Sequence, residues 1–200
     1  MGRGVIGSYG MAAALIAALS VCVPLRAEEP AGASLAAVGD VPLPGRANRF
    51  DHQSYDGSRH LLFVAHLGDG AVTAVDTRSQ RVVANVEGVS QVHGLLAVPE
   101  LGRLYASATG KQQVVAIDEA GFEIIASIPA GSYPDGMAYI PSRKNLYVSD
   151  KRGAVVVIDV ASNQAVATIA LAGEAGNLSY DPLSDNRRVI VGLASSRFRI

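Results

Sequence analysis

The chain has one cysteine and no tryptophan among its 200 residues. The single cysteine, Cys22, excludes an intramolecular disulfide framework. Only 6% of the residues are aromatic, so the 49% hydrophobic content must pack mainly through small aliphatic side chains. The formal net charge is −1, which excludes the strongly basic composition typical of proteins that bind nucleic acid through their phosphates.

Motifs of the common enzyme classes are also missing. The sequence contains no GxSxG, no HExxH and no pair of cysteines. Residues Ala108–Gln112 (ATGKQ) contain Gly-Lys, but the upstream glycine and the following Ser or Thr of a P-loop are absent. These absences favour a protein that binds a ligand over one that catalyses a reaction.

Residues 1–27 have the pattern of a secretory signal peptide. Arg3 supplies the positive start, Met11–Val23 is apolar, and Pro24–Ala27 can form the cleavage region. The pattern predicts export to the periplasm or beyond the cell, because such a leader directs the chain across a membrane. The apolar run is too short for a membrane span, so we expect no stable span in the mature chain.

Two alternatives to a cleaved leader remain open. One is an uncleaved anchor. The other is a lipoprotein box at Leu19–Cys22, although Val21 is large for the residue before a lipidated cysteine. If cleavage leaves Glu28 as the first residue, the mature chain has 15 basic and 18 acidic side chains and no cysteine. Residues 28–34 are then a short mature N-terminus that we expect to be disordered.

A pattern of four short strands recurs along the rest of the chain. Tyr133–Ile169 divides into runs at Gly136–Ile140, Asn145–Ser149, Ala154–Asp159 and Ala165–Ile169. The third run is apolar at successive positions without alternation, which indicates a strand buried on both faces. One such unit cannot cover its own faces, so further units are expected.

The same pattern repeats with a period of about 42 residues. Equivalent residues lie 41 or 42 positions apart in three sets: Asp76, Asp118 and Asp159; Phe63, Tyr105 and Tyr147; Asp51, His93 and Asp135. Four strands per repeat of this length are typical of the blades of a β-propeller. The predicted fold class is therefore all-β, with four-stranded antiparallel blades.

The repeat at PDGMAYIPSRKNLYVSD and GAVVVIDVASNQAVATI resembles the YVTN-type β-propeller repeat, with NLYVSD at the motif that names the family. The resemblance covers about Leu35 to Ile190. It implies a secreted bacterial propeller, commonly of seven blades. It implies no particular activity.

The repeat predicts the following boundaries: a closure strand at 35–43, blade 1 at 50–87, blade 2 at 93–128, blade 3 at 135–169 and a partial blade 4 at 176–200. The tail SSRFRI lacks the apolar run of the earlier third strands. We therefore favour a C-terminally truncated fragment of a larger, seven-bladed ring. A closed four-bladed ring is the competing interpretation, because one leading strand and fifteen others complete four blades.

Polar residues in two sets of loops form the candidate ligand site. In a propeller, the loops that lead into first strands and those between second and third strands lie on the same face. The first set carries Asp51, His52, His93, Asp135, Glu174 and Asn177. The second set carries His66, Asp69, Lys111, Asp150, Lys151 and Arg152. Imidazole and carboxylate groups around one opening suit a ligand or a divalent metal, with His52 and His93 as candidate metal ligands. Polar residues at strand starts also satisfy backbone groups, which is the alternative interpretation.

The sequence favours a non-catalytic periplasmic propeller that binds a small molecule or a protein at this opening. The alternatives are a metal-assisted hydrolase, similar to the propeller lactonases, and a redox-associated propeller. Binding of nucleic acid is disfavoured, because the mature chain is acidic and poor in aromatic residues.

Overall fold

The computed structural model describes residues 36–183, 188–193 and 197–199. The chain divides into two compact units, Met1–Ala37 and Val38–Ile200, and every described strand belongs to the second. The predicted signal peptide and the segment 28–34 lie outside the described residues. None of the described residues belongs to a helix that is long and apolar enough to cross a membrane.

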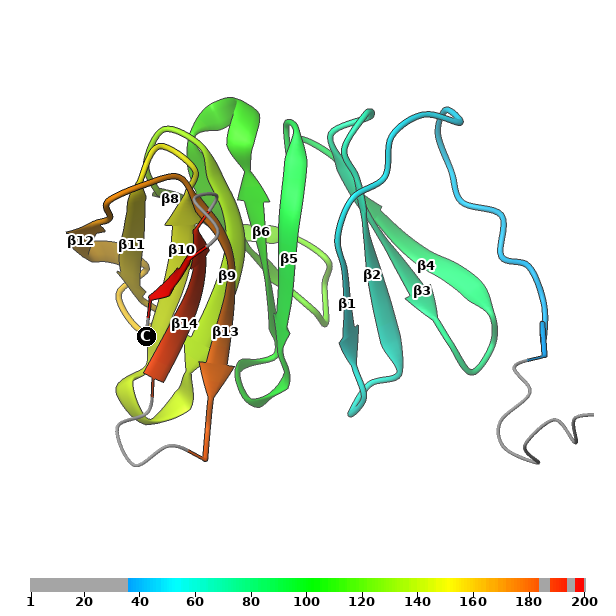
Figure 1. Cartoon of the computed structure of the whole chain (residues 1–200). Helices are drawn as coiled ribbons and strands as arrows, with labels where there is room; N and C mark the ends of the chain where they lie inside the picture. Colours follow the sequence, from blue (N-terminus) through cyan, green and yellow to red (C-terminus); the bar gives the residue numbers. More distant parts are fainter. Residues whose placement is uncertain (1–35, 184–187, 194–196, 200) are drawn as a thin grey trace, which may run out of the picture. The chain divides into compact units, whose positions relative to one another are not determined.

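The described residues form fifteen strands and three short 3-10 helices (Figure 1). The strands of the first two sheets are β1 Gln53–Asp56, β2 Leu61–His66, β3 Ala71–Asp76, β4 Arg81–Val86, β5 Val92–Val98, β6 Arg103–Ala108, β7 Gln113–Asp118 and β8 Ile124–Pro129. Those of the other two are β9 Pro134–Ile140, β10 Asn145–Asp150, β11 Ala154–Asp159, β12 Gln164–Ala170, β13 Ala175–Asp181, β14 Arg188–Leu193 and β15 Arg197–Arg199. The 3-10 helices are η1 Pro99–Leu101, η2 Thr109–Lys111 and η3 Pro141–Arg143.

Each sheet is an antiparallel meander in chain order, with four strands in blades 1 to 3 and three described strands in blade 4. The first strands β1, β5, β9 and β13 lie side by side along successive blades (Figure 1). The predicted all-β fold, a partial β-propeller of about three full blades and part of a fourth, is confirmed.

The third strand of each full blade is buried along its length, as its continuous apolar run predicts. In β11, Val155 to Ile158 are all buried, and β3 and β7 show the same pattern. The outer strand β12 is exposed at every position. Three apolar clusters fill the spaces between neighbouring blades. Each blade therefore buries its apolar faces against the next blade, which a single blade could not do alone.

The recurring aspartates that follow third strands are turn formers. Asp118 Oδ2 accepts hydrogen bonds from the backbone amides of Ala120 and Gly121, at 3.1 and 2.7 Å. Asp76 and Asp159 accept equivalent bonds from the amides of the residues two positions on. Backbone hydrogen bonds, from Arg78 to Asp76 and from Ser162 to Asp159 above all, lower the pKa of both carboxyl groups. A structural role for the three residues follows directly from these contacts.

One expectation about the ends of the fold differs from the structure. The predicted closure strand at 35–43 is not formed, since residues 36–43 carry no strand. An extended segment becomes a strand only when a neighbour pairs with it. In contrast, residues 197–199 form β15, paired with β14 through Gly192 opposite Phe198. This short third strand is part of the predicted partial fourth blade, because strand pairing is made by backbone groups and does not require an apolar run.

Candidate functional site

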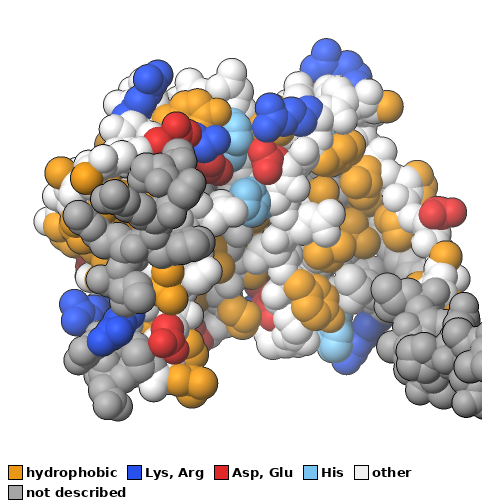
Figure 2. Space-filling model, in the orientation of Figure 1, with side chains coloured by type: hydrophobic (Ala, Val, Ile, Leu, Met, Phe, Trp, Pro, Cys, Tyr) orange, Lys and Arg blue, Asp and Glu red, His pale blue; other side chains and the backbone are white. Residues whose placement is uncertain are grey.

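The loops predicted to share one face do lie at a common edge of the sheets. We call this the upper edge: it is where β1, β5 and β9 begin and where β2, β6 and β10 end. In Figure 2, histidine, acidic and basic side chains gather over this end of the sheets, which is uppermost in the view. Antiparallel pairing accounts for the arrangement, because the start of each first strand lies opposite the end of the second.

His93, near the start of β5, is held by groups from two blades. Its Nδ1 lies 2.8 Å from the Gln91 carbonyl oxygen and 3.0 Å from Thr109 Oγ1. A carbonyl oxygen can only accept, so Nδ1 carries the proton, and the Nε2 of a neutral ring accepts the hydroxyl proton of Tyr133 at 3.2 Å. Thr109 in turn donates to the Pro134 carbonyl oxygen of blade 3. The network fixes the tautomer and orientation of a ring that is only 6% exposed.

Tyr133 and Lys151 extend this network to a carboxylate. Lys151 Nζ lies 3.3 Å from Asp135 Oδ2 and 5.2 Å from the centre of the Tyr133 ring. Burial alone would lower the pKa of Lys151, but the Asp135 carboxylate, Tyr133 and Glu174 raise it above its usual value. Lys151 therefore remains a cation, and its side chain is 37% exposed beside a nearly buried acid.

Asp150, the last residue of β10, shapes the loop that carries Tyr133. Its carboxylate accepts hydrogen bonds from the backbone amides of Ser132, Tyr133 and Arg152, at 2.9, 2.9 and 3.0 Å. Gly131 begins this loop with φ of +90°, and a Cβ there would lie 2.4 Å from Asp150 Oδ2. Asp150 thus positions the network and does not form part of an open ligand site.

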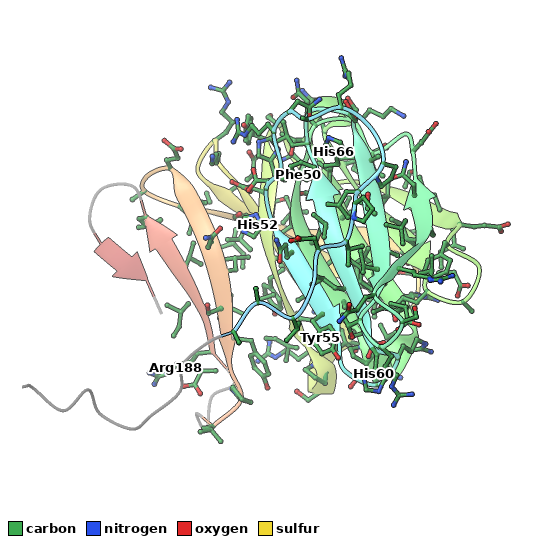
Figure 3. All side chains as sticks on the ribbon, turned by 90° about the vertical axis from the view of Figure 1, so that its right-hand side faces the viewer. Phe50, His52, Tyr55, His60, His66 and Arg188 are labelled. Atoms are coloured by element: carbon green, nitrogen blue, oxygen red, sulfur yellow. The ribbon has the colours of Figure 1, made fainter. Side chains whose placement is uncertain are left out.

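His66, at the end of β2, belongs to a separate cluster in blade 1. Its Nε2 lies 2.7 Å from Asn48 Oδ1 and 3.0 Å from the Arg46 carbonyl oxygen, and its ring stacks on Phe50 at 4.2 Å (Figure 3). Hydrogen bonds from the Arg46 amide and from Asn48 lower the pKa of the neighbouring Asp69 to about 2. The cluster fastens the incoming chain onto blade 1.

Asp51 and His52 lie at the start of β1, next to blade 2. His52 Nδ1 is 3.1 Å from Asp51 Oδ1, yet it has no well-aligned hydrogen bond among the described residues. The backbone amide of His52 donates to the carbonyl oxygen of His93 at 3.4 Å. His52 and His93, the two predicted metal ligands, are therefore linked by a backbone hydrogen bond.

Glu174 and Asn177 lie at the corresponding place in blade 4. Both side chains are exposed. Glu174 acts on the site through its charge, which contributes to the raised pKa of Lys151. Asn177 lies against Gly136 of blade 3, where a Cβ would be 3.1 Å from the Asn177 Cα.

The structure thus joins His93 and Asp135 through Tyr133 and Lys151, and keeps His66 apart. Within the described ranges, no group of three His, Cys, Asp or Glu side chains could hold a metal ion. Both ring nitrogens of His93 already contact protein atoms, so coordination would require this network to open.

The sequence argument missed Tyr133 and Thr109 as members of the site. An available signal was the aromatic residue just before a first strand, which occurs as Phe50 in blade 1 and as Tyr133 in blade 3. In both places the ring contacts a histidine, His66 or His93. Thr109 gave no signal, because its contact depends on how two blades approach each other.

Comparison with solved structures supports the fold. The chain is similar to the hydrazine synthase of Kuenenia stuttgartiensis, with a TM-score of 0.68 and 23% identity over 81% of this chain and 46% of that one. It is also similar to the WD40 β-propeller domain of Doa1, with a TM-score of 0.65 and 14% identity over 80% of this chain and 52% of that one. The chain spans about half the length of these solved chains.

No family model matches the sequence, and a search of curated proteins finds no relative. The fold and the upper edge together define a β-propeller protein with a polar network between its blades. At these levels of identity the likeness concerns the fold alone, and the resemblance to the YVTN-type repeat stays a prediction.

Proposed function

We propose that this chain is a non-catalytic binding propeller of the YVTN type, exported to the periplasm, that recognises its ligand at the upper edge. The observation that carries the proposal is the fixed network of His93, Tyr133, Lys151 and Asp135. Side chains held in one geometry before binding lose less entropy when a ligand arrives. Function resides in such sites of named residues and not in the fold as a whole.

The network favours a small polar ligand that carries both an acceptor and a donor. Lys151 presents a part-exposed ammonium group next to the part-exposed Tyr133, and both can serve an acceptor. The exposed Glu174 can serve a donor or a cation, while the buried Asp135 holds Lys151 in place. A zwitterion such as an amino acid meets both requirements, whereas a simple anion would face two carboxylates.

A thermal-shift screen of amino acids, sugars and simple anions tests this proposal. Compounds that bind the native state raise its melting temperature in proportion to their saturation of the site. We expect zwitterions to stabilise the wild-type protein and to lose this effect in Lys151→Ala. Lys144→Ala is the matched control, because Lys144 is exposed and lies in the turn after η3.

Two results would overturn the assignment. One is a set of stabilising compounds whose effect survives in Lys151→Ala. The other is an equal loss in Lys144→Ala, which would indicate a general effect of charge.

A metal-assisted hydrolase or a redox-associated propeller is the alternative function. One solved chain with this fold is, by its name, an enzyme, but the likeness extends only to the fold. Zinc, copper and iron content of the purified protein, measured before and after His52→Ala and His93→Ala, separates the two functions. A stoichiometric metal that both substitutions remove would replace the binding proposal.

A further inference from the structure

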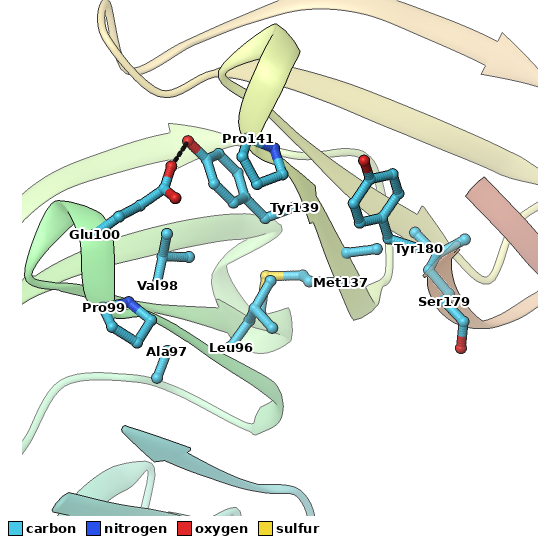
Figure 4. A pocket seen from close by; sticks show the side chains of 12 residues that line it. Leu96, Ala97, Val98, Pro99, Glu100, Met137, Tyr139, Pro141, Ser179 and Tyr180 are labelled. Atoms are coloured by element: carbon cyan, nitrogen blue, oxygen red, sulfur yellow. Dashed lines mark hydrogen bonds between the residues drawn. The ribbon is translucent and has the colours of Figure 1, made fainter. Parts of the chain in front are cut away.

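A groove crosses the first strands at the end of the sheets opposite the upper edge. Its volume is about 660 Å³, and it is lined by the second halves of β5, β9 and β13 together with η1 and the start of η3 (Figure 4). This volume is in the range of pockets that hold small molecules. The residues that the argument uses are Leu96, Glu100, Met137, Tyr139 and Tyr180.

The floor of the groove is apolar. Met137 and Leu178 are each 8% exposed, and Leu96 packs against the cluster between blades 2 and 3. Tyr139 and Tyr180 occupy equivalent positions in β9 and β13, 41 residues apart. Both rings border the groove from neighbouring blades, and both are only partly buried.

One carboxylate is fixed at the wall of the groove. The Tyr139 hydroxyl donates to Glu100 Oε1 at 2.9 Å, which links blade 3 to η1 of blade 2. Burial, together with the Glu100 carboxylate, raises the pKa of Tyr139 to about 12, so the hydroxyl keeps its proton. Among the twelve residues that line the groove, Glu100 is the only Asp, Glu, Lys, Arg or His.

We propose that this groove binds an organic ammonium cation. The carboxylate of Glu100 neutralises the charge, the electron-rich faces of Tyr139 and Tyr180 attract it, and the apolar floor covers its alkyl or aryl groups. Cations are attracted to tyrosine faces within about 6 Å, more strongly where water is excluded. An anion would be repelled by the Glu100 carboxylate, and no lining side chain carries a positive charge that could neutralise it.

The site is independent of the upper edge. Its residues lie at the other ends of the first strands, and it uses none of the residues of the His93 network. Failure of one proposal therefore leaves the other unaffected.

Isothermal titration of the full-length protein with benzyltrimethylammonium tests the proposal, with benzenesulfonate as a probe of similar size and opposite charge. We expect saturable binding of the cation, weaker binding at high salt, and no measurable binding of the anion. Glu100→Gln should weaken cation binding about tenfold, because it removes the charge and keeps the shape. Tyr180→Leu should also weaken it, since it keeps the apolar cover and removes a π face.

Glu123→Gln is the matched control. Glu123 is an exposed acid of the same blade that does not line the groove, so its loss changes net charge equally without altering the site. Circular dichroism establishes that each variant is folded. The proposal is overturned if the wild-type protein does not bind the cation, if it binds both probes equally, or if Glu100→Gln and Glu123→Gln bind alike.

Discussion

Asp56 and Glu119 hold their carboxyl groups around a single guanidinium group at the contact between blades 1 and 2. Arg59 Nη1 lies 3.1 Å from Asp56 Oδ2 and 3.5 Å from Glu119 Oε2. The two acids are 0% and 2% exposed. Burial, with the neighbouring Asp56, raises the pKa of Glu119 to about 7. Burial alone would also raise the pKa of Asp56, but hydrogen bonds from Ser58, Glu119 and Arg59 hold it well below its usual value.

This pair predicts a loss of stability as pH rises towards neutrality. The folded state keeps the Glu119 proton up to about pH 7, whereas the unfolded chain releases it near its ordinary pKa of 4.5. Stability is therefore greatest below pH 4.5 for this group and falls between 4.5 and 7. The difference amounts to about 3 kcal/mol. Urea denaturation of the wild-type protein and Glu119→Gln at a series of pH values measures it.

Glu119→Gln should remove this pH dependence, since an amide does not titrate. Asp56 stays ionised throughout the window and does not contribute to the difference. Glu119→Val is a second test, because Val160 occupies the equivalent position in blade 3. The backbone amide of Val160 donates to the Lys144 carbonyl oxygen, and the amide of Glu119 donates in the same way to the Gly102 carbonyl oxygen. If the stability of wild-type protein and Glu119→Gln changes in parallel from pH 4.5 to 7, the assignment is wrong.

The repeats of the sequence were sufficient to predict the blades, and the reason is visible in particular residues. The run Val155–Ile158 is buried on both faces and recurs at the spacing of the blades. The turn roles of Asp76 and Asp118 follow from local hydrogen bonds. Features decided within a few residues, and repeated three times, are therefore readable without a structure.

Contacts between blades could not be predicted in the same way. Arg59 and Glu119 are 60 residues apart, and no local pattern links them. The contact between His93 and Tyr133 depends on the approach of two loops from different blades. Such pairs depend on how whole sheets pack against each other. The sequence repeat predicts that the sheets are neighbours but not which side chains meet between them.

Asp150 offers a prediction about the loop that carries the candidate site. Asp150→Ala removes the acceptor of three backbone amides and should cost about 3 kcal/mol, at about 1 kcal/mol for each hydrogen bond lost. Asp150→Asn retains one oxygen and should cost less. Urea denaturation measures both. If Asp150→Ala and Asp150→Asn are both as stable as the wild-type protein, water replaces these hydrogen bonds at no cost and the prediction is wrong.

Export is predicted from residues 1–27. A fusion of the chain to a reporter that is active only in the periplasm should be active, because the leader carries the chain across the inner membrane. Mass spectrometry of the purified protein should give a mature chain that begins near Glu28. A deletion of residues 2–27 is the control and should abolish reporter activity. Intact Met1 in the protein recovered from the periplasm would contradict cleavage.

The close approach of first strands gives the last prediction. Gly94 of β5 lies against β9, and a Cβ placed on it would be 2.0 Å from the Asp135 carbonyl oxygen. Gly94→Ala must therefore push the two blades apart, and we expect a loss of at least about 3 kcal/mol. The equivalent Gly136 lies against β13 with 3.1 Å to the Asn177 Cα, so Gly136→Ala should cost less. Gly57→Ala is the control, because the only contact there is with a tyrosine side chain at 3.6 Å and its φ is not in the left-handed region. Thermal unfolding of the three variants should rank them in this order. Because the shift at Gly94 also moves His93 of blade 2 away from Tyr133 of blade 3, it should weaken ligand binding at the upper edge. A Gly94→Ala protein as stable as Gly57→Ala would mean that the blades are not in contact at this point.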